Sequence, residues 1–185
     1  MSKNVIDSVN EYLKEKRVAY LNITGAVRKM MESGAEAKPS VLTTKGRICG
    51  RSGVREVIDG DGFRYITDTG AVWNGNNVGP NAPTCFIAAL NSCIMHTAAV
   101  IAAEQEIDMD YCTCDMEADY YPVGGYLGFE NVPKGPQNIR FVLTIDSTES
   151  EERLDKFLKD IEERCPVGSL LKVGPKGKLV NIHEK

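Results

Sequence analysis

The sequence lacks the patterns that mark the commonest catalytic and cofactor sites. It contains no G-x-G-x-x-G, G-x-S-x-G or H-E-x-x-H motif, so it shows no dinucleotide fingerprint, no hydrolase nucleophile elbow and no zincin helix. The formal net charge of −4 argues against nucleic acid or an anionic membrane as the main partner. With 42% hydrophobic and 26% charged residues, the composition is that of an ordinary globular domain.

Cysteine is too scarce for a disulfide scaffold, at six in 185 residues. The N-terminal segment is charged and periodic, without an apolar core or a small-residue cleavage site, so no secretory signal is evident and we expect a cytoplasmic protein. We expect no metal and no cofactor. Cys112-x-Cys114 on a strand is a poor chelator, and no second Cys/His pair completes four ligands.

Apolar periodicity predicts an α+β fold with antiparallel sheet. The expected elements, in chain order, are a helix over residues 3–34, strands over 40–49, 54–58 and 63–67, an apolar helix from 83 to about 106, a strand over 109–121, a loop over 122–137, a strand over 139–145, a helix up to 164 and a strand over 179–182. A capping box from Thr148 to Glu151 opens the last helix. The expected domains are an N-terminal helical extension, 1–37, and a core domain, 38–185.

Residues 82–103 carry no charge if His96 is neutral, and this segment is long enough to span a bilayer. Pro83, Asn91 and His96 interrupt it, and no basic cluster flanks it. We therefore expect a central helix buried on all sides within a soluble fold, with no membrane partner. His96 is either a base for a neighbouring thiol or a buried, neutral imidazole bonded to a backbone carbonyl.

Two cysteines stand in settings suited to thiol chemistry. Cys93 lies in the apolar helix, where a thiol resists ionisation unless a cation is brought to it. Cys165 follows a charged helix and precedes Pro166, where the N-cap of a new turn would lower its pKa. Each also has a structural interpretation, Cys93 as a small core residue and Cys165 as part of a helix terminator. If the two meet, an oxidised thiol can be trapped as a disulfide.

Three stretches resemble the OsmC/Ohr family, the osmotically inducible and organic hydroperoxide resistance proteins. They are residues 79–93 (GPNAPTCFIAALNSC), residues 163–167 (ERCPV) and the turn at residues 50–53 (GRSG). The resemblance implies an OsmC-like fold, in which antiparallel sheets surround a buried central helix, and an intertwined homodimer with composite active sites.

The resemblance also implies a thiol peroxidase that needs no cofactor. Cys93 would attack an organic hydroperoxide, Cys165 would resolve the sulfenic acid as a disulfide, and an external dithiol would reduce that disulfide. Arg51 would stabilise the Cys93 thiolate and orient the peroxide. Arg47 and Arg55 lie on the same hairpin and are alternatives for that role.

The sequence departs from the family in the loop before the central helix. Organic hydroperoxide resistance proteins carry a glutamate there, whereas residues 69–79 contain no acid and Asp68 is the nearest candidate. Two other functions therefore stay open. One is disulfide exchange, and the other is an OsmC-fold protein that binds a small apolar or thiol ligand without turnover. Loop aromatics, namely Trp73, Tyr126 and Phe129 with Tyr120 and Tyr121, would line the binding site for either a ligand or a peroxide.

Overall fold

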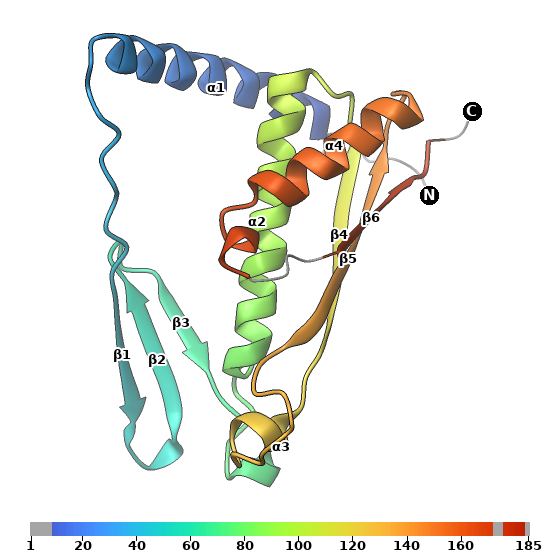
Figure 1. Cartoon of the computed structure of the whole chain (residues 1–185). Coiled ribbons are helices and arrows are strands. Elements are labelled where there is room, and N and C mark those ends of the chain that lie inside the picture. The colour runs from blue at the N-terminus through green and yellow to red at the C-terminus, as the bar shows by residue number, and fades with distance from the viewer. Residues whose placement is uncertain (1–8, 172–175, 184–185) are drawn as a thin grey trace. The chain divides into compact units, whose positions relative to one another are not determined.

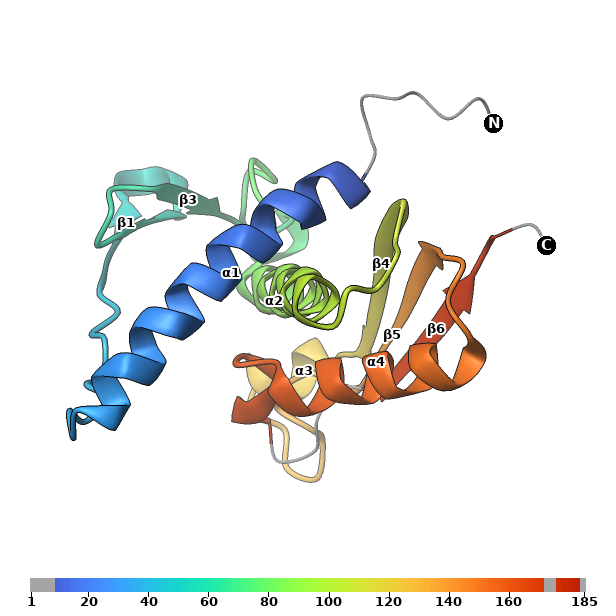
Figure 2. The same cartoon turned by 90° about the horizontal axis from the view of Figure 1, so that it is seen from above.

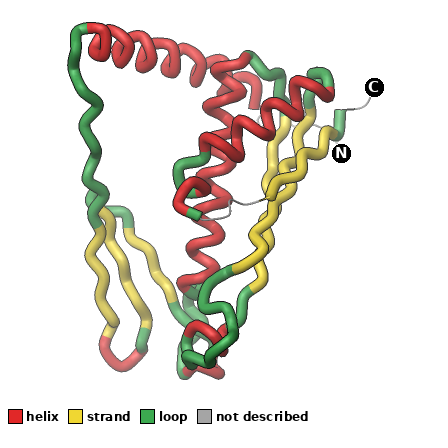
Figure 3. Tube along the Cα trace, in the orientation of Figure 1, coloured by secondary structure: helices red, strands yellow, loops and turns green. Residues whose placement is uncertain are grey.

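The computed structural model describes residues 9–171 and 176–183 (Figure 1). The chain divides into two compact units, one formed by residues 36–88 and the other by residues 1–35 together with 89–185. Each unit holds one three-stranded sheet (Figure 3). The α+β class expected from the sequence is confirmed.

The smaller unit is an antiparallel meander, as the sequence predicts. Its strands are β1 (Thr44–Cys49), β2 (Val54–Asp59) and β3 (Arg64–Thr67), in that order across the sheet. A single 3-10 turn, η2 (Gly50–Ser52), joins β1 to β2. Gly50 begins this turn and Gly53 follows it, with φ angles of 51° and 69°, which few residues other than glycine adopt at low cost. The two glycines thereby present Arg51 at the tip of the hairpin.

The larger unit is built on the sheet β4 (Tyr111–Asp119), β5 (Gln137–Asp146) and β6 (Lys176–Asn181). β4 pairs with β5 antiparallel, but β6 runs parallel to β5, so this sheet is mixed where the sequence led us to expect only antiparallel pairing. The reason is the helix α4 (Glu151–Arg164), which carries the chain from the end of β5 back to its beginning. A crossover helix of this kind returns the next strand in the same direction.

The core lies between this sheet and two helices, α4 and α2 (Ala82–Gln105), which cover the same face of the sheet (Figure 2). Alternate residues of β5 are buried because side chains of a strand point to opposite faces in turn. α4 buries one stripe at helical spacing. The buried side chains of these elements include Leu90, Ile94, Ile101, Phe141, Leu143, Ile145, Leu154, Phe157 and Ile161.

α2 corrects one expectation, because only one of its faces is buried within the chain. Leu90, Ile94 and Ala98 are buried on that face, whereas Met95 and His96 are exposed. His96 is therefore not the buried imidazole of one sequence interpretation. Of the described helices, α2 is long and apolar enough to cross a membrane by length and composition, a test that core helices of soluble proteins also pass.

The helix α1 (Val9–Glu32) accounts for most of the expected N-terminal helix; the start predicted at residue 3 lies outside the described residues. Leu13 is buried, and Arg17 Nη1 donates to the carbonyl of Ala103 at 2.9 Å near the C-terminus of α2. Arg17 also pairs with Glu106 at 2.5 Å. A cation at a helix C-terminus satisfies free carbonyls and the helix dipole, so Arg17 docks α1 on α2.

The shorter elements complete the chain. They are η3 (Ala71–Trp73), α3 (Pro122–Gly125) within the long loop predicted from the sequence, and η4 (Gly168–Leu170). The cap of α4 differs from the expected capping box, since Ser150 is the N-cap and its side chain accepts the Arg153 N–H at 3.4 Å. The shift of two residues places Glu151 inside the first turn, where its charge complements the helix dipole.

Candidate active site

The fold brings Cys93 and Cys165 together. Cys93 lies half-buried within α2, and Cys165 is buried at the C-cap of α4 with 1% of its surface exposed. Their side chains lie close enough for Cys93 to act on the Cys165 thiol, and neither forms a disulfide. Polar contacts between the two helices hold this approach: Arg164 Nη1 lies 2.5 Å from Glu104 Oε2, and Gln105 Nε2 donates to Asp160 Oδ2 at 2.5 Å.

Opposing influences act on the Cys165 thiol. Burial raises its pKa most, and the hydrogen bond and charge of Cys93 raise it further. Backbone N–H groups of Gly168 and Val167 lower it, and the Gly168 nitrogen lies 3.3 Å from Sγ. The net shift is upward, so the Cys165 thiol stays protonated at neutral pH.

The backbone after α4 turns so that its N–H groups point toward the Cys165 sulfur. Cys165 is the C-cap of α4, and its own N–H donates to the Ile161 carbonyl at 3.1 Å. Pro166 has no N–H and cannot continue the helix, so the chain turns into η4. The N–H groups that begin this turn then face Sγ. The sequence suggested that Cys165 is the N-cap of the following turn, whereas in the structure it is the C-cap of α4. Its sulfur nevertheless accepts the Gly168 N–H, as an N-cap side chain does.

The three candidate arginines of the small unit differ in their partners. Arg47 Nε lies 2.5 Å from Glu56 Oε2, a carboxylate that Arg64 also binds at 2.6 Å. Arg55 donates to the Gly53 carbonyl at 3.3 Å. Arg51 is exposed in η2, and its side chain forms no hydrogen bond or ion pair with any described residue. Arg51 is thus the member of the three whose guanidinium is uncommitted within its unit.

Asp68, the acid nearest to the missing loop glutamate, organises the loop that leads to α2. It is fully buried, and it accepts backbone N–H groups from Thr69 at 2.8 Å, Asn76 at 3.0 Å and Val78 at 3.2 Å. These hydrogen bonds, with that of Thr69 the largest, hold the pKa of Asp68 below its ordinary value against the effect of burial, and the Arg55 charge adds to them. The carboxylate therefore orders the loop and faces Arg55.

The predicted binding aromatics are exposed. Tyr126 and Phe129 belong to the loop that contains α3, with 51% and 59% of their surfaces accessible, and the Tyr126 ring meets Tyr120 edge to face at 6.4 Å. Trp73 lies in η3 of the other unit and is 43% exposed. The structure therefore places two of the three on one apolar loop.

The remaining predictions for cysteine concern Cys112 and Cys114. Both lie on β4, and burial raises the pKa of each to about 11. Thiols with such values stay protonated at neutral pH and are poor nucleophiles and poor ligands. Among the described residues no group of three or more His, Cys, Asp or Glu side chains could hold a metal ion.

Comparison with known proteins identifies the family of the chain. The sequence model described as "OsmC-like protein" matches residues 75–180, which include both Cys93 and Cys165. The chain belongs to the OsmC-like protein family. This membership confirms the resemblance seen in the sequence, while no curated protein sequence matches the chain.

Solved structures with the OsmC-like fold are similar throughout their length. The organic hydroperoxide resistance protein OsmC of Legionella pneumophila shares 17% identity with a TM-score of 0.56, over 79% of this chain and 100% of that one. The OsmC-like protein of Mycoplasma pneumoniae shares 18% identity with a TM-score of 0.59, over 78% and 99%. OhrB of Bacillus subtilis shares 17% identity with a TM-score of 0.51, over 76% and 97%. At these identities the likeness shows the fold.

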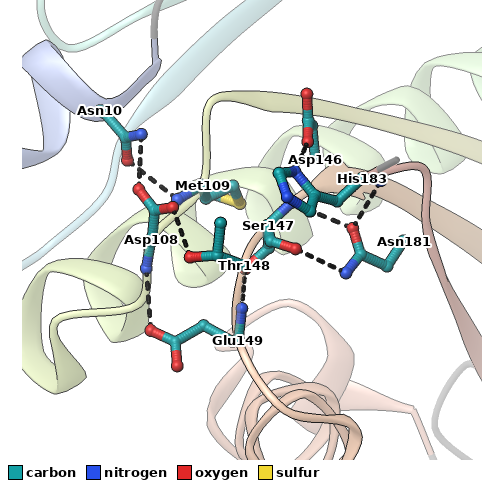
Figure 4. Close-up of polar contacts among 9 residues, drawn as sticks. All are labelled: Asn10, Asp108, Met109, Asp146, Ser147, Thr148, Glu149, Asn181 and His183. Carbon is teal, nitrogen blue, oxygen red and sulfur yellow. Dashed lines mark hydrogen bonds and ion pairs between the residues drawn. The ribbon is translucent and has the colours of Figure 1, made fainter. Parts of the chain in front are cut away.

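The OsmC-like chain also contains a polar cluster that the sequence analysis missed (Figure 4). Asp146 is buried at the end of β5, and its Oδ1 lies 2.7 Å from His183 Nδ1. The Asn181 side chain accepts the Ser147 N–H and donates to the Ser147 carbonyl. Asn10 of α1 donates to Asp108 at 2.7 Å. These residues lie far apart in sequence and form no motif, so they are recognised only from the fold. Their contacts connect α1, β5 and the end of β6.

Proposed function

We propose that this OsmC-like protein reduces organic hydroperoxides with Cys93 as the attacking thiol and Cys165 as the resolving thiol. The observation that carries the proposal is the direct interaction of the two side chains within one unit, with Cys165 as the protonated partner. The organic hydroperoxide resistance proteins among the similar solved structures support the same chemistry.

The proposed reaction balances in three steps. The Cys93 thiolate attacks the terminal peroxide oxygen, the O–O bond breaks and Cys93 becomes a sulfenic acid, while the leaving alkoxide takes a proton from solvent and departs as the alcohol. Cys165 then gives up its proton and its sulfur attacks the Cys93 sulfur, which forms the disulfide; the displaced hydroxyl and the proton leave as water. An external dithiol finally reduces the disulfide and is itself oxidised.

Arg51 is the proposed cation for Cys93. Arg47 is bound to Glu56 and Arg55 faces Asp68, which leaves Arg51 with a guanidinium available to a thiolate and a peroxide. An opposite charge within a few ångströms lowers a thiol pKa by about 1–3 units, so Arg51→Ala is expected to slow peroxide reduction by ~10- to 1,000-fold at neutral pH. Arg51→Lys is expected to recover part of the rate because it restores the charge without the forked donors.

A homodimer is the proposed assembly. α2 exposes Met95 although it has no charged residue before Glu104, and α1 exposes Ile23 and Val27. A second copy of the chain would cover apolar surface of this kind. Light scattering coupled to gel filtration would measure the mass of the assembly. The apolar loop around Tyr126 and Phe129 is the proposed contact for the organic group of the peroxide.

The test is peroxide consumption with cumene hydroperoxide and a dithiol. Cys93→Ser is expected to abolish turnover, whereas Cys165→Ser performs one turnover and then overoxidises to sulfinic acid. Cys85→Ser, which changes another half-buried cysteine of α2, is the matched control and retains activity. Equal consumption by wild type and Cys93→Ser would refute the peroxidase, and ligand binding without turnover would then favour the binding protein.

A further inference from the structure

The two sulfurs differ in accessibility. Cys93 Sγ belongs to a half-buried residue, while Cys165 has 1% of its surface exposed. An attacking thiolate approaches a disulfide along the S–S axis, so it needs open space at the sulfur that it attacks. Within the chain, Cys93 is thus the more accessible of the two residues.

The two sulfurs also differ in the hydrogen-bond donors that can stabilise a leaving thiolate. At Cys165 the Gly168 N–H points at Sγ from 3.3 Å, and the Val167 N–H also favours the thiolate. Hydrogen bonds from backbone amides partly offset the desolvation of a buried thiolate. A leaving thiolate at Cys165 thus has donors already in place, whereas the described residues give no hydrogen bond from a backbone N–H to the Cys93 sulfur.

From these two differences we propose that the external dithiol attacks Cys93 Sγ of the oxidised protein and that Cys165 leaves; this inference rests on the proposed function. The S–S bond between the two cysteines breaks, a bond forms between Cys93 Sγ and the reductant, and Cys165 Sγ takes the electron pair and then a proton. The second thiol of the reductant next attacks its own sulfur in the mixed disulfide, which releases Cys93 as thiolate and the reductant as a cyclic disulfide.

The experiment traps that intermediate with glutathione, a monothiol that cannot complete the second step. The disulfide is prepared in two ways, with one equivalent of cumene hydroperoxide and with diamide, so that its formation does not depend on peroxidase activity. After brief exposure to isotope-labelled glutathione, the reaction is quenched with acid and free thiols are blocked with N-ethylmaleimide. Trypsin would leave Cys85, Cys93, Cys112 and Cys114 in one peptide, so digestion uses pepsin at low pH and fragment spectra locate the label.

The expected result is glutathione on Cys93 and maleimide on Cys165, in ~10-fold excess over the reverse pattern. Label mainly on Cys165, or equally on both, overturns the inference. Failure of diamide to form the disulfide also overturns it. If diamide forms the disulfide but the peroxide does not, the proposed function fails while the site of attack is still determined.

A second measurement does not depend on trapping. Glutathione is attached to Cys93 in the Cys165→Ser protein and to Cys165 in the Cys93→Ser protein, and a dithiol then releases it. The adduct on Cys93 should be reduced ~10-fold faster because its sulfur is open to attack. Equal rates, or faster release from Cys165, would contradict the inference.

Discussion

Replacing Ile161 with alanine tests whether the packing of α4 sets the approach of the two thiols. Ile161 is fully buried one turn before Cys165, and its carbonyl accepts the Cys165 N–H at 3.1 Å. Truncating a fully buried isoleucine to alanine costs about 2–5 kcal/mol, from lost transfer free energy and the cavity left behind. Natural domains are stable by about 5–15 kcal/mol, so the variant is expected to fold at low temperature but to unfold at lower denaturant concentration.

The same change should slow formation of the disulfide. A cavity beside the last turn of α4 lets Cys165 shift relative to Cys93, and a displacement near 1 Å can cost about 100-fold in a reaction that depends on orientation. We expect disulfide formation after a single peroxide addition to slow by about 10-fold in Ile161→Ala. Stopped-flow mixing with an acid quench and thiol counting measures this rate.

Leu154→Ala is the matched control. Leu154 is buried at 4% exposure on the same face of α4, near the opposite end of the helix from Cys165. It should lose similar stability in urea unfolding at fixed protein concentration, yet form the disulfide at the wild-type rate. If both variants slow the reaction equally, the effect comes from global stability, and the reasoning about local positioning is wrong.

Three further predictions concern residues outside the thiol pair. Backbone hydrogen bonds hold the pKa of Asp68 below its ordinary value of 3.8. The stability that the Asp68 carboxylate contributes is therefore fully present above pH 3.8 and is lost as the pH falls through the lower pKa of the folded state. Wild type and Asp68→Asn should differ in urea midpoint at pH 7 and converge in strong acid. Cys112 and Cys114, with pKa values raised to about 11, should resist iodoacetamide at pH 8 in the folded protein, and mass spectrometry showing fast alkylation would contradict their burial. Ser150→Ala removes the N-cap of α4 and should cost about 1 kcal/mol in urea unfolding, with Ser150→Asp retaining the cap.

Much of the fold could be predicted because the periodic segments are long and glycine or proline residues mark their ends. The meander follows from alternating residues separated by glycine turns, and α4 from its buried stripe ending at Pro166. The parallel direction of β6 was missed, although the helix predicted between the two strands is the kind of crossover that joins parallel strands. The burial of α2 was overestimated because an apolar helix has the same composition whether its own chain or another surface covers it.

The site was predicted in part. Cys93 and Cys165 could be chosen from their local settings, and the fold shows that their side chains interact. The amide of Gly168 beside Sγ could not be predicted, because it depends on the turn that follows Pro166. The roles of Arg51, Trp73, Tyr126 and Phe129 remain predictions.

The contact between Cys93 and Cys165 spans much of the chain, since β4, β5 and α4 all lie between the two residues. A covalent bridge there would close a loop of about 70 residues and remove roughly 4 kcal/mol of conformational entropy from the unfolded chain. The oxidised protein should therefore melt at a higher temperature than the reduced one. Thermal denaturation would then report the redox state of the pair directly, without any probe of catalysis.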